Sequence, residues 1–315
     1  MIELDVHADD YALTAHTSQD ILECMKKGKL DSISVMVNMS CSGRCIDMLI
    51  KAIPELPFLP KMSIHLDFVE GKCLAGGSEV PLLAKNGSDL TGLSWGNLFV
   101  LSCHPGKRKA AKEQLKKEIR AQLSVGQREI RRCMEEAQKH HIPCAQKGMR
   151  IDAHQHAHMI PVVWEALTEV IVEEDYTVEY IRNSKELLGV FLMDLSLWKT
   201  YRPINFVKNR LLYLFSFKVD RYMEKHAMQQ MYLWGLVMSG HMDYDRIVRL
   251  CPAIEKKAEK GHRKLEFCIH PGQMLAEEVT EEVERCAAED FYLHSNRQIE
   301  KDAVMRLSQL REKTL

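Results

Sequence analysis

Three histidines and an aspartate recur at every second position of residues 151–158. They are Asp152, His154, His156 and His158, and uncharged residues separate them. If this stretch is a strand to its end, side chains two residues apart share a face, so we expect all four to point the same way. Imidazole and carboxylate groups are common metal ligands. The spacing therefore predicts a metal site, and the alternative is a surface strand that carries scattered histidines.

Further groups that could do chemistry stand at the ends of other predicted strands. They are the pair Asp9 and Asp10, His65, and His270. A carboxylate with two imidazoles can hold a divalent ion and leave positions open for water. Adjacent residues of one strand cannot both point the same way, so one aspartate would bind the metal while the other takes a proton from water. His270 could then protonate a leaving group.

Each of these groups also has a purely structural explanation. Asp9 and Asp10 could cap a helix, His65 could be a core or surface histidine, and His270 could belong to a turn with Pro271 and Gly272. Only their coincidence at strand ends favours a functional site.

Strands and helices alternate along most of the chain. Predicted strands cover 1–8, 31–39, 62–68, 149–155, 177–182 and 265–269. Predicted helices cover 17–29, 44–52, 107–140 with a possible break near Gly126, 161–171, 245–260, 277–286 and 298–310. Residues 70–105 are expected to be rich in loops. Such βα units indicate an α/β fold with a parallel sheet. One strand face is aliphatic and the other polar, which favours a barrel over an open doubly wound sheet.

Composition and charge are those of a soluble globular protein. The chain has 315 residues, 46% of them hydrophobic and 28% charged, with a formal net charge of −1. This balance gives no reason to expect binding to nucleic acid or an anionic membrane. The first residues do not resemble a secretory signal, and the ten cysteines show no repeated spacing, so we expect a reduced, cytoplasmic protein. No apolar run reaches the ~18 residues that a membrane span needs.

Residues 186–232 differ from the rest because aromatic and basic residues are interleaved there. We expect a helical lobe on a single domain that spans 1–315. The favoured interpretation is that its aromatics pack on the barrel, and its tip would contribute to a homodimer or to the substrate cleft. Contact with a membrane is the least favoured alternative, because the net charge is near zero.

Several motifs resemble those of the YdjC-like carbohydrate deacetylases. Residues 7–13 (HADDYAL) resemble the family's NADDFGL-type start, although His7 stands where Asn is frequent. Residues 63–66 (SIHL), 151–161 (IDAHQHAHMIP) and 266–272 (EFCIHPG) resemble its other motifs, as do 235–242 and 292–300. The resemblance spans nearly the whole chain, in family order. It implies a distorted TIM-like barrel and metal-dependent removal of N-acetyl groups from sugars such as chitooligosaccharides.

The same resemblance implies roles for individual residues. It assigns the metal to Asp10, His65 and His154, the general base to Asp9 and the catalytic acid to His270. Two further residues are expected to contact substrate, namely Arg182, which could instead orient Asp9, and Asn38. The expected cofactor is one divalent ion, zinc or magnesium, with manganese, cobalt and nickel as alternatives. The expected partner is a small N-acetylated carbohydrate. The rival functions are another metal-dependent hydrolase, such as a phosphoesterase, and a non-catalytic binding protein.

Overall fold

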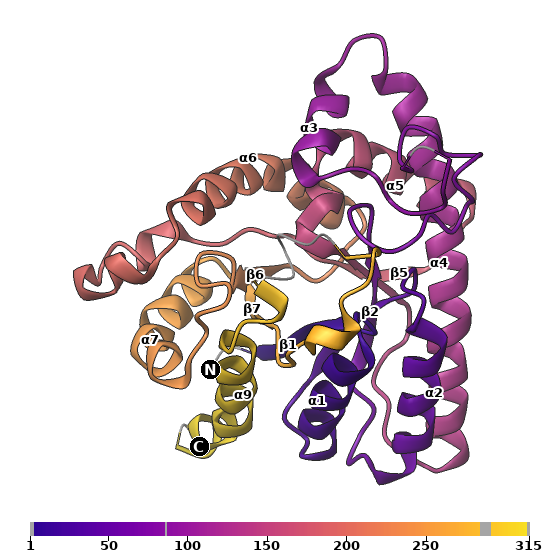
Figure 1. The fold of residues 1–315 in the computed structure, drawn as a ribbon. Coiled ribbons are helices and arrows are strands. Elements are labelled where there is room, and N and C mark those ends of the chain that lie inside the picture. Colours follow the sequence, from indigo (N-terminus) through magenta and orange to yellow (C-terminus); the bar gives the residue numbers. More distant parts are fainter. Residues whose placement is uncertain (1–2, 86, 284–290, 314–315) are drawn as a thin grey trace.

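A computed structural model describes residues 3–85, 87–283 and 291–313, and seven parallel strands form its central sheet (Figure 1). The strand order is β5-β4-β3-β2-β1-β7-β6. The strands are β1 (Leu4–Tyr11), β2 (Ser32–Met36), β3 (Lys61–Leu66), β4 (Met149–Ala153), β5 (Val178–Ile181), β6 (Met231–Trp234) and β7 (Lys264–Ile269). All six predicted strands are present, and the predicted α/β class is confirmed.

Helices connect the strands. They are α1 (Ala15–Lys26), α2 (Ser42–Ala52), α3 (Trp95–Cys103), α4 (Arg108–Lys139), α5 (Pro161–Glu173), α6 (Pro203–Lys225), α7 (Tyr244–Lys260) and α9 (Asn296–Lys313). Local signals explain several starts. The Thr14 side chain caps α1 by accepting from the Thr17 backbone N–H, and Pro161 opens α5 where its missing N–H costs nothing. Among the described residues, no helix has both the length and the apolar content needed to cross a bilayer.

The sheet curls so strongly that strands far apart in its order touch. Four strands separate β5 from β7, which in a flat sheet would place them about 24 Å apart. Nevertheless, the Tyr180 hydroxyl on β5 donates to Glu266 on β7 at 2.6 Å. The curled sheet is a half-barrel that stays open, because β5 and β6 do not pair within the described residues. An irregular hydrogen bond, from Leu233 N to Lys185 O at 3.1 Å, links β6 to the segment that follows β5.

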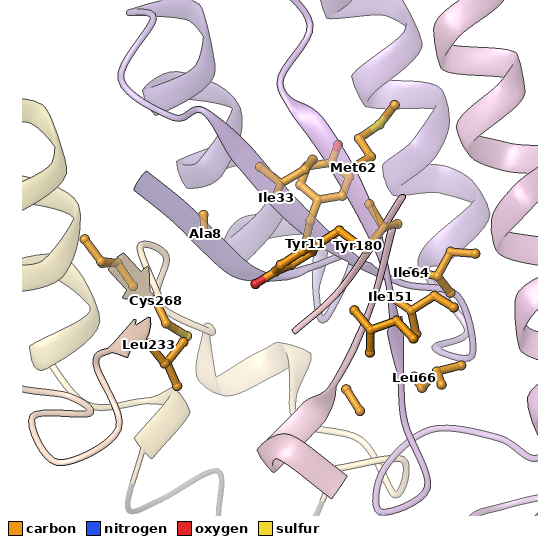
Figure 2. Close-up of a cluster of buried hydrophobic side chains, with 14 of the residues drawn as sticks. Ala8, Tyr11, Ile33, Met62, Ile64, Leu66, Ile151, Tyr180, Leu233 and Cys268 are labelled. Atoms are coloured by element: carbon orange, nitrogen blue, oxygen red, sulfur yellow. The ribbon is translucent and has the colours of Figure 1, made fainter. Parts of the chain in front are cut away.

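The outer face of the half-barrel is aliphatic and lies under helices. Ile64 is in register with Ile151 and with Val35, and all three side chains are buried. Figure 2 shows Ile33, Ile64 and Ile151 on neighbouring strands of this core. Burying such a row is the main source of stability for a sheet of this kind.

The structure differs from the predicted elements in four places. Helix α4 is continuous through Gly126. A glycine is needed there because α4 packs closely on Ile64, and a Cβ would lie 2.7 Å from that side chain. Residues 70–105 contain α3, and the predicted lobe at 186–232 ends in strand β6. The predicted helix 277–286 is only a 3₁₀ turn at Ala276–Glu278 followed by non-helical residues to 283, and its last residues lie outside the described part.

Candidate metal centre

Strand β1 ends in an irregular segment that brings two carboxylates to one place. The register with β2 shifts between Ala8 and Tyr11, and Asp10 has a φ of 66°, in the left-handed region that aspartate tolerates better than most residues. Asp9 and Asp10 consequently line the same pocket. The sequence expectation assumed a regular strand, whereas here both carboxylates reach one pocket although they are neighbours in the chain.

The histidine tract after β4 is not a strand. Regular pairing stops at Ala153, and Gln155 and His156 have φ values of 52° and 60° in a 3₁₀ segment, His154–Met159. The predicted common face therefore does not form. His154 lies against Asp10, whereas the ring of His156 contacts the Ser184 hydroxyl at 3.0 Å.

His158 is a structural histidine. Its Nε2 donates to the backbone carbonyl of Arg182 at 2.7 Å, and its side chain is buried. Burial is the main reason that its pKa is lowered to about 4, so the ring is neutral. His158 holds the start of the segment after β5 in place and does not face the metal candidates.

Asp10, His65 and His154 come together as a buried group in which one ligand atom from each lies within 4.8 Å of the others. The Nδ1–H of His65 donates to Asp152 at 2.7 Å, which turns Nε2 toward Asp10 at 3.5 Å. His65 Nε2 has no hydrogen-bond partner among the described residues although it is buried. A buried nitrogen lone pair aimed at a carboxylate oxygen is unfavourable unless a cation lies between them.

His154 presents the same situation. The Tyr292 hydroxyl donates its one hydrogen to Glu70 at 3.0 Å. Toward His154 Nε2, 2.9 Å away, it can therefore act only as an acceptor, so this nitrogen carries a hydrogen. This network assigns the lone pair to His154 Nδ1, which lies 3.1 Å from Asp10 Oδ1. These three residues therefore fit a divalent cation, and their mixed nitrogen and oxygen donors suit zinc, manganese, cobalt or nickel better than magnesium.

The pKa values of these side chains also favour a cation at this position. Burial alone would lower the pKa of His65, but Asp152 and Asp9 outweigh it and raise the pKa to about 10. Burial would raise the pKa of Asp10, yet Arg297, whose Nη2 donates to Asp10 at 2.7 Å, and the two histidines hold it well below the usual range. The site thus favours positive charge between these side chains, and a metal would compete with protons for it.

Asp9 is held by a buried arginine. Arg182 donates to both Asp9 oxygens at 2.8 Å, and it also donates to Glu266. Burial would raise the pKa of Asp9, but Arg182 and the neighbouring histidines hold it well below the usual value, so Asp9 is ionised. The Cys268 thiol adds a further hydrogen bond at 3.1 Å.

The two predicted substrate contacts lie apart from the pocket surface. Arg182 is completely buried and touches three carboxylates, so its position is that of a residue that orients Asp9. Asn38 is also buried, and its amide donates to the Glu70 backbone carbonyl at 2.7 Å. Neither residue lines the pocket above the metal candidates. Contact between these residues and a substrate stays a prediction.

His270 follows β7, as expected, and lines the pocket beside Asp9. Its Nε2 lies 4.0 Å from Asp9 Oδ2, and its Nδ1 lies 3.4 Å from Glu300. Glu300 also accepts from the His270 backbone N–H at 2.7 Å, which fixes the residue at the strand end. The ring packs edge-on against Phe291.

Sequence reasoning gave no role to several residues around the centre. Glu70, Tyr292, Arg297 and Glu300 each contact a candidate residue, and three of them come from one C-terminal segment. The family resemblance of residues 292–300 was the only signal for that segment. The partners are too far apart in the chain for spacing to connect them.

A pocket of about 350 Å³ opens above the centre. It is lined by the start of α6, by residues 291–292 and by the candidate residues Asp9, Asp10, His65 and His154. Arg202, directly before α6, lines it with Asn205 and Lys208 of the helix. Burial lowers the pKa of Lys208 to about 8. A larger groove of about 760 Å³ lies at the other end of the sheet, between α4 and the starts of β4 and β5, away from the candidate ligands.

These features define an α/β protein with a candidate metal centre at the carboxyl end of a parallel half-barrel. The profile of the YdjC-like protein family matches residues 3–311, so the chain belongs to that family. Membership suggests a carbohydrate-processing hydrolase.

One solved structure similar to this chain comes from Enterococcus faecalis and is described as a candidate cellobiose-phosphate cleavage protein. The two chains are 14% identical, with a TM-score of 0.56 over 99% of this chain and 94% of the other. At that identity the likeness shows the fold alone. No curated protein matches the chain significantly.

Proposed function

We propose that this protein removes the N-acetyl group from a small acetylated carbohydrate in a metal-dependent hydrolysis. The observation that carries the proposal is the buried group of Asp10, His65 and His154, with ionised Asp9 and His270 on the same pocket. A divalent ion held by the three residues would polarise the acetyl carbonyl and make bound water more acidic. Membership of the YdjC-like family supports a carbohydrate as the substrate.

Asp9 is the proposed base and His270 the proposed acid. Arg182 engages both Asp9 oxygens, so the carboxylate is fixed in orientation and must receive the proton through a remaining lone pair. His270 is close enough to Asp9 for both to reach one substrate, and Glu300 holds it there. A proton taken at Asp9 and one delivered by His270 to the departing amine complete the hydrolysis.

The pocket supports a small substrate. A volume of about 350 Å³ is at the lower end of typical ligand sites, which suits one or two sugar rings. Phe291, which is partly exposed, offers aromatic surface to a sugar, whereas Tyr292 is buried behind it. The description of the Enterococcus protein, which names a phosphorylated disaccharide, agrees with a carbohydrate substrate. A cytoplasmic location, a homodimer and zinc or magnesium as the native metal stay predictions.

The test is acetate release from N-acetylated mono- and oligosaccharides, after chelation and re-addition of each divalent metal. His154→Ala should lose bound metal and activity, whereas the exposed His104→Ala should keep both. Asp9→Asn should keep the metal and lose ~10²–10⁴-fold in rate. The exposed Asp47→Asn is its control.

Two outcomes would sink the proposal. Phosphate release from phosphorylated sugars without acetate release would identify a phosphoesterase on the same scaffold. Full metal content and full activity in His154→Ala would remove the metal assignment.

A further inference from the structure

The solvent side of α6 is unusually apolar. Ile204, Val207, Leu214 and Phe217 are 65%, 63%, 64% and 45% exposed. Successive spacings of three, seven and three residues place them along one side of the helix. Single exposed valines elsewhere, such as Val100, are normal for a protein surface, but four large apolar side chains in a row are a patch that marks an interaction site.

The same side of α6 is basic. Arg210 and Arg221 are exposed and, within the described structure, have no ion-pair partner, and Lys218 is also exposed and reaches only Glu165, at 4.0 Å. The carboxylates of the helix are engaged elsewhere. Asp220 is buried with Lys185 and Arg263, and Glu224, in the last turn, accepts from Gln230. The face therefore combines exposed aliphatic groups with uncompensated positive charge.

This combination selects the kind of partner. A second copy of the chain, packed α6 against α6 across a two-fold axis, would bring the basic side chains of both helices together. An anionic bilayer surface satisfies both features, since apolar side chains enter the headgroup region while arginine and lysine meet lipid phosphates. We propose that the solvent side of α6, defined by Ile204, Val207, Arg210, Leu214, Phe217 and Arg221, binds the surface of an anionic lipid bilayer.

The geometry of the helix agrees with this orientation. Its 23 residues make a rod of about 35 Å that can lie flat on a surface, and in Figure 1 it extends away from the sheet. Trp198, 48% exposed, precedes the helix, and tryptophan is favoured at membrane interfaces. Asn205 and Lys208 line the pocket from the opposite side of α6. Binding would therefore hold the pocket about one helix diameter, ~10 Å, from the lipid headgroups.

The experiment is sedimentation of the full-length protein with vesicles, which needs no enzymatic activity. Vesicles of phosphatidylcholine alone are compared with an equal mixture of phosphatidylcholine and phosphatidylglycerol, at low and high salt. We expect the protein to pellet with the anionic vesicles only, and less at high salt. Ile204→Ser combined with Val207→Ser and Leu214→Ser should abolish pelleting. Arg210→Glu with Arg221→Glu should weaken it by about fivefold or more for each residue changed.

Matched controls use exposed residues outside the face. Val100→Ser on α3 and Lys51→Glu on α2 should pellet like the wild-type protein, and thermal unfolding checks that every variant is folded. Equal pelleting with neutral vesicles, or no pelleting with either kind, overturns the proposal. So does a wild-type dimer that ignores vesicles and becomes a monomer in the triple serine variant, because the face would then be a subunit interface.

Discussion

The two faces of the curled sheet are built on different principles. The outer face carries Val35, Ile64 and Ile151 in register under helices. These side chains are buried, and any apolar neighbour of suitable size can cover them. The inner face carries Arg150, Arg182, Asp152 and Glu266, which are equally buried but need particular partners. Apolar burial is non-directional, whereas a buried charge is tolerated only with a matched neighbour. The inner face is therefore the one where a single change should have the largest effect.

Arg182→Met should have the largest effect. It removes the cation that contacts Asp9, Asp152 and Glu266. Three buried carboxylates then lack the positive charge that balances them. We expect a loss of about 4 kcal/mol in the free energy of unfolding, measured by urea denaturation. Arg182→Lys should recover little, because an ammonium cannot reproduce the two parallel bonds to Asp9. A loss below that of an outer-face truncation would contradict the comparison.

Ile151→Ala tests the outer face. It opens a cavity at a fully buried position next to Ile64, and the expected loss is about 3 kcal/mol. Because no charge is involved, the loss should be the same at acidic and neutral pH. The exposed Val100→Ala serves as the control and should change stability very little. A strongly pH-dependent loss would show that the two faces are coupled.

Gly126→Ala examines how closely α4 lies on the outer face. A new Cβ would meet three Ile64 side-chain atoms at 2.7–2.9 Å. We expect about 2 kcal/mol of strain against a gain of about 1 kcal/mol in helix propensity, hence a net loss of about 1 kcal/mol. In α3, Gly96→Ala has only Ser94 Oγ nearby, at 3.7 Å, and should be neutral or stabilising. Equal effects at both glycines would argue against the close contact.

Asp5→Asn should give the smallest effect, and it tests whether the stability of the inner face depends on pH. Burial raises the pKa of Asp5 above its ordinary value of 3.8, although Arg150 opposes this. A carboxyl with a raised pKa favours its neutral form in the folded state, so its ionisation costs stability as pH rises above 3.8. Relative to Asp5→Asn, the wild-type protein should lose stability as the pH rises from about 4 to neutral, and by less than Gly126→Ala costs. A relative gain over that range would reverse the sign and refute the assignment.

Sequence periodicity determined the outer face and located β1, β2, β3, β4, β5 and β7. Alternation over residues 1–8, 62–68 and 149–155 depends only on side chains two apart, so it can be recognised without knowing any neighbour. It also placed Asp9, Asp10, His65 and His270 at the carboxyl ends of strands. The choice of His154 from the histidine tract came from family resemblance, because spacing treated the three histidines alike.

Only the tertiary structure decided how the site is assembled. Left-handed backbone at Asp10, Gln155 and His156 breaks the alternation from which their directions were predicted. The curl of the sheet brings Arg182 to Asp9, and the C-terminal segment brings Tyr292 to His154 and Arg297 to Asp10. These contacts join residues more than a hundred positions apart, and their energies depend on burial and on each other's charge. Local sequence encodes neither, since both arise only when the chain has closed around the group.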